Sequence, residues 1–152
     1  MDPISAPQSV SAAIQLSVAP VFLMVAVGSM LNVMTSRLAR VVDRARTLES
    51  MIIEGEPERE EQTHRQELTG LNKRMTYVQR AIVFNAIAAV LIAFLVALIF
   101  LSDLANQTAD QAIASLFIMS MGAITIGLWF FLLEIFVATQ TLRVRAEFLQ
   151  KK

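Results

Sequence analysis

Residues 81–101 read AIVFNAIAAVLIAFLVALIFL, an almost continuous run of apolar side chains in which Asn85 is the one strongly polar residue. A helix needs about 20 mostly apolar residues to cross a hydrocarbon layer about 30 Å thick, and this run has that length. Serine and aspartate follow it at once, in the short polar stretch SDLANQTAD. The run therefore predicts a membrane-spanning helix that ends near residue 101.

Two further stretches of this kind lie on either side of it, at residues 12–34 and 112–133. Pro20 interrupts the first of them, but a proline can kink a transmembrane helix without preventing it. The whole composition agrees, because hydrophobic residues make up 55% of the chain, charged residues make up 17%, and the mean hydropathy is +0.57. Soluble domains are less apolar and more charged than this. We expect an all-α integral membrane protein with three transmembrane helices.

The distribution of basic residues predicts the orientation of these helices. The chain has 13 Lys and Arg, which all lie between Arg37 and Arg80 or between Arg143 and Lys152. Basic residues in short segments next to membrane helices are retained on the cytoplasmic side. The expected order is an external segment 1–11, a span 12–34, a cytoplasmic helical hairpin 35–80, a span 81–101, an external loop 102–111, a span 112–133 and a cytoplasmic helical tail 134–152.

The segment 35–80 carries two sets of apolar residues spaced alternately by three and four, which is the heptad pattern of coiled coils. These sets are Leu38, Val41, Ala45, Leu48 and Ile52, and then Leu68, Leu71, Met75, Val78 and Ile82. Gly55 and Pro57 favour a turn near Glu56 between them. We expect an antiparallel coiled-coil hairpin that continues the first two spans into the cytoplasm. The alternative is a pair of amphipathic helices lying on anionic headgroups, but the mixed charges of the segment favour the hairpin.

This topology predicts a layer of polar side chains at the cytoplasmic edge of the membrane. A hairpin that turns near Glu56 places Asn32 level with Arg80, and an outer loop that turns between Asn106 and Gln107 brings Glu134 to the same level. The expected members of the layer are Asn32, Thr35, Arg37, Arg80, Asn85 and Glu134.

Glu134 is the most informative member, because an acid between two apolar runs is costly in a membrane unless it is paired or hydrated. We expect Arg80 or Arg37 to be its partner. Two interpretations stay open at this point. The pair can fix the register of the helices, or it can belong to an ion or proton path.

Several classes of function lack their residues in this sequence. The chain has no cysteine and one histidine, His64, so a transition-metal site is not expected. There is no Gly-rich phosphate loop and no Ser–His–Asp set, so we expect neither an enzyme nor a cofactor, and no catalytic residues. Basic residues alternate with acids and not with aromatic residues, which argues against nucleic-acid binding. The expected partners are the lipid bilayer and a second copy or another membrane protein.

Three stretches carry a resemblance to a known family: NVMTSRLARVVDRARTLE at residues 32–49, RQELTGLNKRMTYVQRAI at 65–82 and LLEIFVATQTLRVR at 132–145. Together, and in this order, they resemble the small bacterial membrane proteins of the domain of unknown function 2721 family. The resemblance implies a bacterial inner-membrane protein with this three-helix plan. It implies no activity and assigns no residue a role.

Two functions remain for such a chain, and a third, a membrane-embedded enzyme or accessory subunit, is disfavoured by the missing catalytic residues. The first is a non-enzymatic scaffold or interaction protein that self-associates or binds a partner through the cytoplasmic hairpin. The second is a homo-oligomeric ion channel or transport pore. In it the first span lines the path with Gln15, Ser17, Asn32 and Thr35, and Asn32, Arg80 and Glu134 form the inner mouth. The pattern of packing residues favours the first.

Overall fold

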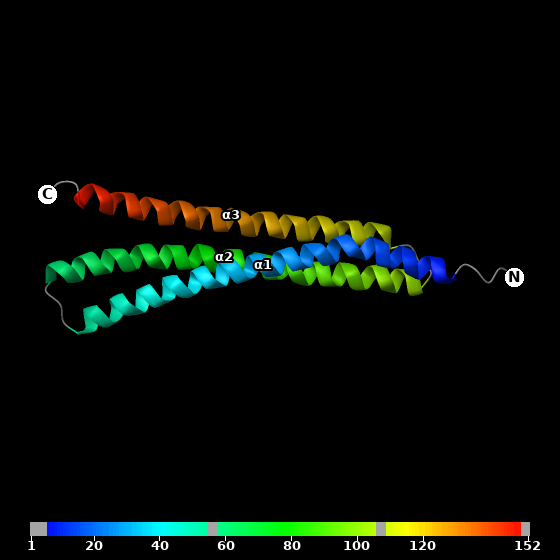
Figure 1. The fold of residues 1–152 in the computed structure, drawn as a ribbon, viewed down its shortest axis with the longest axis horizontal. Helices are drawn as coiled ribbons and strands as arrows, with labels where there is room; N and C mark the ends of the chain where they lie inside the picture. Colours follow the sequence, from blue (N-terminus) through cyan, green and yellow to red (C-terminus); the bar gives the residue numbers. More distant parts are fainter. Residues whose placement is uncertain (1–5, 55–57, 106–108, 150–152) are drawn as a thin grey trace. The chain divides into compact units, whose positions relative to one another are not determined.

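The structure is a computed structural model, and it describes the backbone of residues 6–54, 58–105 and 109–149 and the side chains of residues 11–54, 62–105 and 109–139. These ranges contain three α-helices and no strand: α1 (Ala6–Ile53), α2 (Glu58–Leu104) and α3 (Asp110–Leu149), which Figure 1 colours along the chain. The predicted all-α class with three helices is confirmed. The turns expected near Glu56 and between Asn106 and Gln107 lie outside the described residues.

Each helix contains a segment that is long and apolar enough to cross a membrane. These segments are Ser11–Ile53, Gln62–Leu104 and Asp110–Thr139, and each includes one of the spans predicted from the sequence. Length and composition together indicate a multi-pass membrane protein. The bounds of the spans within these longer helices remain predictions.

Hydroxyl side chains in the apolar stretches are bonded within their own helices. Each donates a hydrogen bond of 2.8–3.1 Å to a backbone carbonyl three or four residues earlier; the donors are Ser17, Ser29, Ser102, Ser115, Ser120 and Thr125. An unbonded hydroxyl in hydrocarbon would be costly, and this local bond removes most of that cost. These residues are therefore compatible with lipid or with a tightly packed neighbour.

The chain forms two compact units, and all three helices contribute to both. The first unit comprises residues 1–31 and 84–126, and the second comprises residues 32–83 and 127–152. In the first unit Ala13, Leu95 and Ile99 form a buried cluster, against which Val96, Ile113 and Leu116 pack. Large apolar residues, among them Phe22, Phe94 and Ile118, remain exposed on this unit. Such a surface suits a lipid solvent.

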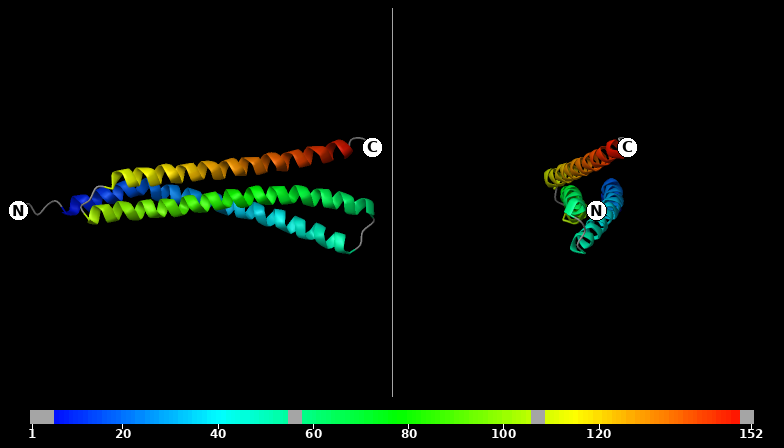
Figure 2. Two further views of the ribbon diagram at one scale, coloured as in Figure 1. Left: turned by 180° about the vertical axis from the view of Figure 1, so that it is seen from behind. Right: turned by 90° about the vertical axis from the view of Figure 1, so that its left-hand side faces the viewer.

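The second unit has a core of its own between α1 and α2, which run antiparallel there (Figures 1 and 2). An ion pair between the two helices flanks the core: Arg44 Nε and Nη2 each lie 3.0 Å from Glu67 Oε1. The buried residues of the core all come from the two predicted heptad sets: Val41, Ala45, Leu48 and Leu71. Leu68 and Met75, which are partly buried, pack against them.

Replacement of Leu48 by alanine tests this core. The Leu48 side chain is 0% exposed, so we expect Leu48→Ala to lower the free energy of unfolding by about 2–5 kcal/mol. Ile53 is the matched control because it is 83% exposed on the same helix, and Ile53→Ala should change stability by less than about 0.5 kcal/mol. Unfolding of the detergent-solubilised protein, followed by circular dichroism, measures both. Equal losses would contradict the core.

Candidate functional site

The most unusual side chain of the second unit is Glu134 on α3, which is 0% exposed although its carboxylate carries a charge that apolar surroundings disfavour. Two arginines meet it, one from each of the other helices. Arg37 of α1 places Nη2 3.0 Å from Glu134 Oε2, and Arg74 of α2 places Nη2 2.9 Å from Oε1. The carboxylate is therefore engaged on both of its oxygens.

The two contacts differ in geometry. Arg74 donates two hydrogen bonds to Glu134 Oε1, from Nη2 at 2.9 Å and from Nε at 3.2 Å. Arg37 is close enough to Oε2 for an ion pair, but that oxygen accepts no directed hydrogen bond. Both guanidinium groups are partly solvated, with side chains 28% exposed for Arg37 and 22% for Arg74. The buried acid therefore depends on the arginines for its neutralisation.

Two phenylalanines on α3 position arginines as well. The guanidinium carbon of Arg37 lies 5.3 Å from the ring centroid of Phe131, and that of Arg80 lies 5.6 Å from the ring centroid of Phe130. A cation over an aromatic face within about 6 Å is attracted by the ring quadrupole. Phe131 lies three residues before Glu134, so the ring and the carboxylate share one side of α3 and meet Arg37 together.

Of the two partners expected for Glu134, the structure places Arg37 beside the carboxylate and Arg80 over Phe130. Counting residues from the turns does not take into account the angle at which a side chain projects from the helix. Arg74 and Arg80 are six residues apart, which is about 240° of rotation at 3.6 residues per turn. The structure places Arg74 beside Glu134 and Arg80 over Phe130.

Arg74 is not among the members of the predicted layer, and it lies next to Met75 and three residues after Leu71 of the predicted heptad set. The residues at helical spacing from Arg74 are Val78 and Ala81, which are both 0% exposed. A basic residue in line with such a buried stripe can contact a third helix. The signal for Arg74 was therefore the spacing of 74, 78 and 81, together with the long reach of an arginine side chain.

The predicted layer also contains Asn32, Thr35 and Asn85. Asn32 and Thr35 belong to the second unit but are exposed, and the Asn32 carbonyl accepts the Thr35 hydroxyl at 3.0 Å. Asn85 is 0% exposed and belongs to the first unit. We call Arg37, Arg74 and Glu134, which two ion pairs join, the charged cluster.

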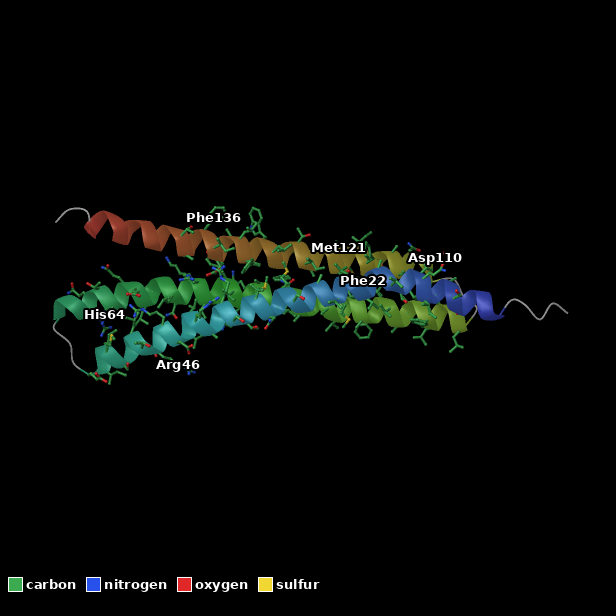
Figure 3. All side chains as sticks on the ribbon, in the orientation of Figure 1. Phe22, Arg46, His64, Asp110, Met121 and Phe136 are labelled. Carbon is green, nitrogen blue, oxygen red and sulfur yellow. The ribbon has the colours of Figure 1, made fainter. Side chains whose placement is uncertain are left out.

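The described side chains hold no alternative centre of metal chemistry. Within residues 11–54, 62–105 and 109–139, no three His, Cys, Asp or Glu side chains gather closely enough to hold a metal ion. His64 lies on α2 near the end of α1 (Figure 3). It is separated along α2 from Arg74, the residue that this helix contributes to the charged cluster. The charged cluster is therefore the strongest candidate site among the residues described.

A double-mutant cycle tests whether the charged cluster acts as one unit. Glu134→Gln removes the buried charge and leaves two facing arginines, so we expect a loss of about 3–5 kcal/mol in the free energy of unfolding. Arg74→Gln should be costly too, because it removes both directed hydrogen bonds to the acid. In the double variant the losses should not add, with a coupling of about 0.5–3 kcal/mol. Unfolding in mixed detergent micelles measures all three variants.

Arg80→Gln is the matched control for this cycle, since Arg80 is a nearby arginine on the same helix whose guanidinium meets Phe130. Combined with Glu134→Gln, its effect should be additive within about 0.5 kcal/mol. A large coupling for Arg80 and none for Arg74 would mean that the acid pairs differently from the arrangement described here.

Comparison with known proteins gives one match. A family model described as protein of unknown function (DUF2721) matches residues 17–144, which include the whole of the charged cluster and both helical stretches that form the core of the second unit. No curated protein matches the sequence. No solved structure matches it either. Because the family model covers most of the chain, this protein belongs to the DUF2721 family.

Proposed function

We propose that this chain is a non-enzymatic helical protein of the bacterial inner membrane that serves as a scaffold or interaction protein. In this proposal it crosses the membrane three times, with the amino terminus outside and residues 35–80 and 134–152 in the cytoplasm. Residues 35–80 form a coiled-coil hairpin through which the chain self-associates or binds a partner. The absence of basic residues from 1–36 and 81–142 supports the orientation.

The observation that carries this proposal is the pairing of Glu134 with one arginine from each of the other two helices. A carboxylate that takes up and releases ions or protons needs an oxygen open to them. Here the side chain is 0% exposed, and an arginine nitrogen lies within 3.0 Å of each oxygen. Such an arrangement suits a fixed tie between helices better than a transport site, and it favours the structural interpretation of the charged cluster.

The hairpin part of the proposal rests on the core of the second unit. Heptad residues of α1 and α2 pack together there, and the Arg44–Glu67 ion pair flanks them as e and g residues do in coiled coils. On the outer side of α1, Arg46 and Glu49 are exposed, and Figure 3 shows Arg46 directed away from α2. Charged side chains on this side are available to a partner or to a second copy.

Single cysteines test the orientation, and the chain is suited to this because it contains no cysteine of its own. We expect a membrane-impermeant maleimide to label Asp103→Cys in intact spheroplasts and to leave Glu49→Cys unlabelled until the membrane is opened. The two residues are matched in charge and lie on opposite sides in the proposed topology. The reverse labelling pattern, or labelling of both, would refute the orientation.

One observation favours the pore as the alternative function. In the first unit a line of exposed residues at helical spacing runs along α1, half of it polar: Ser11, Gln15, Val18, Phe22, Val25 and Ser29. Ser29 bonds its own helix, whereas no hydrogen bond joins the Gln15 side chain to any other described residue. An exposed glutamine amide in a membrane helix requires water or a partner helix. Asn32 and Thr35, also expected to line a pore, are exposed as well, but Ser17 is buried.

A pore would have to form between copies of the chain. The cavity within the first unit has a volume of about 720 Å³, and ten of the thirteen described residues that line it are apolar. Its polar lining residues are Ser102, Asp103 and Asp110. A mostly apolar cavity of this kind disfavours ions. A conducting path therefore needs the exposed polar residues of α1 from several chains.

The mass of the protein in native nanodiscs and its conductance in liposomes separate the two functions. The scaffold proposal predicts no ion flux, whatever the number of copies. Gln15→Leu should weaken self-association through α1 by about fivefold to thirtyfold if the amide bonds a second copy, which is worth about 1–2 kcal/mol. Thr125→Val is the matched control, because that hydroxyl is bonded within α3. If the unmodified protein conducts ions in liposomes and Gln15→Leu abolishes this conductance, the pore replaces the scaffold as the proposed function.

A further inference from the structure

A second cavity lies in the second unit beside the charged cluster, with a volume of about 290 Å³. Two buried apolar residues, Val41 and Leu71, contribute to its wall. The other described residues that line it are all arginines: Arg37, Arg40, Arg44 and Arg74. We call this cavity the arginine pocket.

The arginine pocket follows from helical spacing. Arg37, Arg40 and Arg44 lie at positions i, i+3 and i+7 of α1, so they project from one side over two turns. Arg74 completes the set from α2. Like charges at this spacing repel one another, and such a cluster is unfavourable for folding unless something negative compensates it.

The carboxylates of the chain compensate only part of this charge. Glu134 pairs with Arg37 and Arg74, and Glu67 pairs with Arg44. Four guanidinium groups against two carboxylates leave an excess of 4 − 2 = +2 around the pocket. The excess centres on Arg40, which is exposed and makes no ion pair or side-chain hydrogen bond with any other described residue.

Donors also remain available on the paired arginines. A guanidinium group has five N–H bonds in a planar fork. Arg74 gives Glu134 its Nε and one Nη2 hydrogen, and Arg44 uses the same two nitrogens toward Glu67. The unused hydrogens of these groups and the whole fork of Arg40 can serve one more anion.

We propose that the arginine pocket binds a phosphate group. Two features support phosphate: guanidinium forks match its oxygens in pairs, and its charge of about −1 to −2 balances the excess. A volume of about 290 Å³ lies at or below the small end of ligand pockets, which suits a single compact anion.

Such a phosphate group has two possible sources, a phospholipid headgroup and free phosphate from solution. Basic pockets between membrane helices on the cytoplasmic side are typical of anionic lipid sites. The binding chemistry is the same for both sources and does not depend on the scaffold function. A failure of the scaffold proposal would leave the arginine pocket in place.

The test uses the full-length protein in a non-ionic detergent with two probes. Native mass spectrometry measures binding of phosphatidylglycerol against diacylglycerol, which lacks the phosphate. Calorimetry measures inorganic phosphate against chloride at equal ionic strength. We expect phosphatidylglycerol or inorganic phosphate to bind, and Arg40→Gln to weaken that binding by tenfold to about a hundredfold through the loss of a charged hydrogen bond.

Arg46→Gln is the matched control, because Arg46 is an exposed arginine of α1 that does not line the pocket. It should change the affinity by less than about twofold. Arg40→Lys keeps the charge and loses the fork, so it gives a second variant should Arg40→Gln fail to fold; we expect it to bind at least about threefold more weakly than the unmodified chain.

Each outcome decides the proposal. Binding of the lipid alone, lost in Arg40→Gln, assigns the pocket to a headgroup, and binding of inorganic phosphate with the same loss assigns it to a free anion. Equal weakening by Arg40→Gln and Arg46→Gln would overturn the proposal, because it would reduce binding to the diffuse field of a basic surface. Failure of the unmodified chain to bind either phosphate-bearing probe would overturn it too.

Discussion

The second unit depends on the neutralisation of one buried carboxylate. Glu134 has no exposure to solvent, so the energy of its charge is set by two guanidinium groups that come from different helices. The need to neutralise Glu134 constrains the packing of the helices as well as these two contacts. It sets which side of α3 faces the other two helices, and it sets how far α1 and α2 can rotate within the unit. Phe131 follows from the same constraint, since it meets Arg37 from the side of α3 that bears the acid.

The arginine pocket and the charged cluster are parts of one electrostatic arrangement. Arg37 and Arg74 belong to both, so an anion in the pocket and the carboxylate of Glu134 draw on the same donors. Binding of an anion in the pocket would therefore alter the strength of the ion pairs between Glu134 and the two arginines. Any change in these ion pairs would in turn alter the affinity of the pocket for the anion. Such reciprocity is a general property of sites that share interacting groups.

The number and type of the helices could be predicted from the sequence, because an apolar run such as 81–101 has no other stable solution in a chain of this size. The residues that pack between α1 and α2 could also be predicted from the sequence, since Val41, Leu48 and Leu71 lie in sets with heptad spacing. Of the two partners of Glu134, Arg37 was predicted from the sequence and Arg74 was not. Counting from a turn gives the depth of a residue, but the choice between Arg74 and Arg80 depends on rotation about the helix, which the packing of a third helix decides.

The pairing of Glu134 has a consequence for the biogenesis of the chain. Its members are far apart in sequence, and a ribosome makes Arg37 first, Arg74 second and Glu134 last. The two guanidinium groups are thus already present when the acid is made, so both partners of the carboxylate precede it along the chain. A nascent chain that stops before α3 carries uncompensated positive charge between its first two helices.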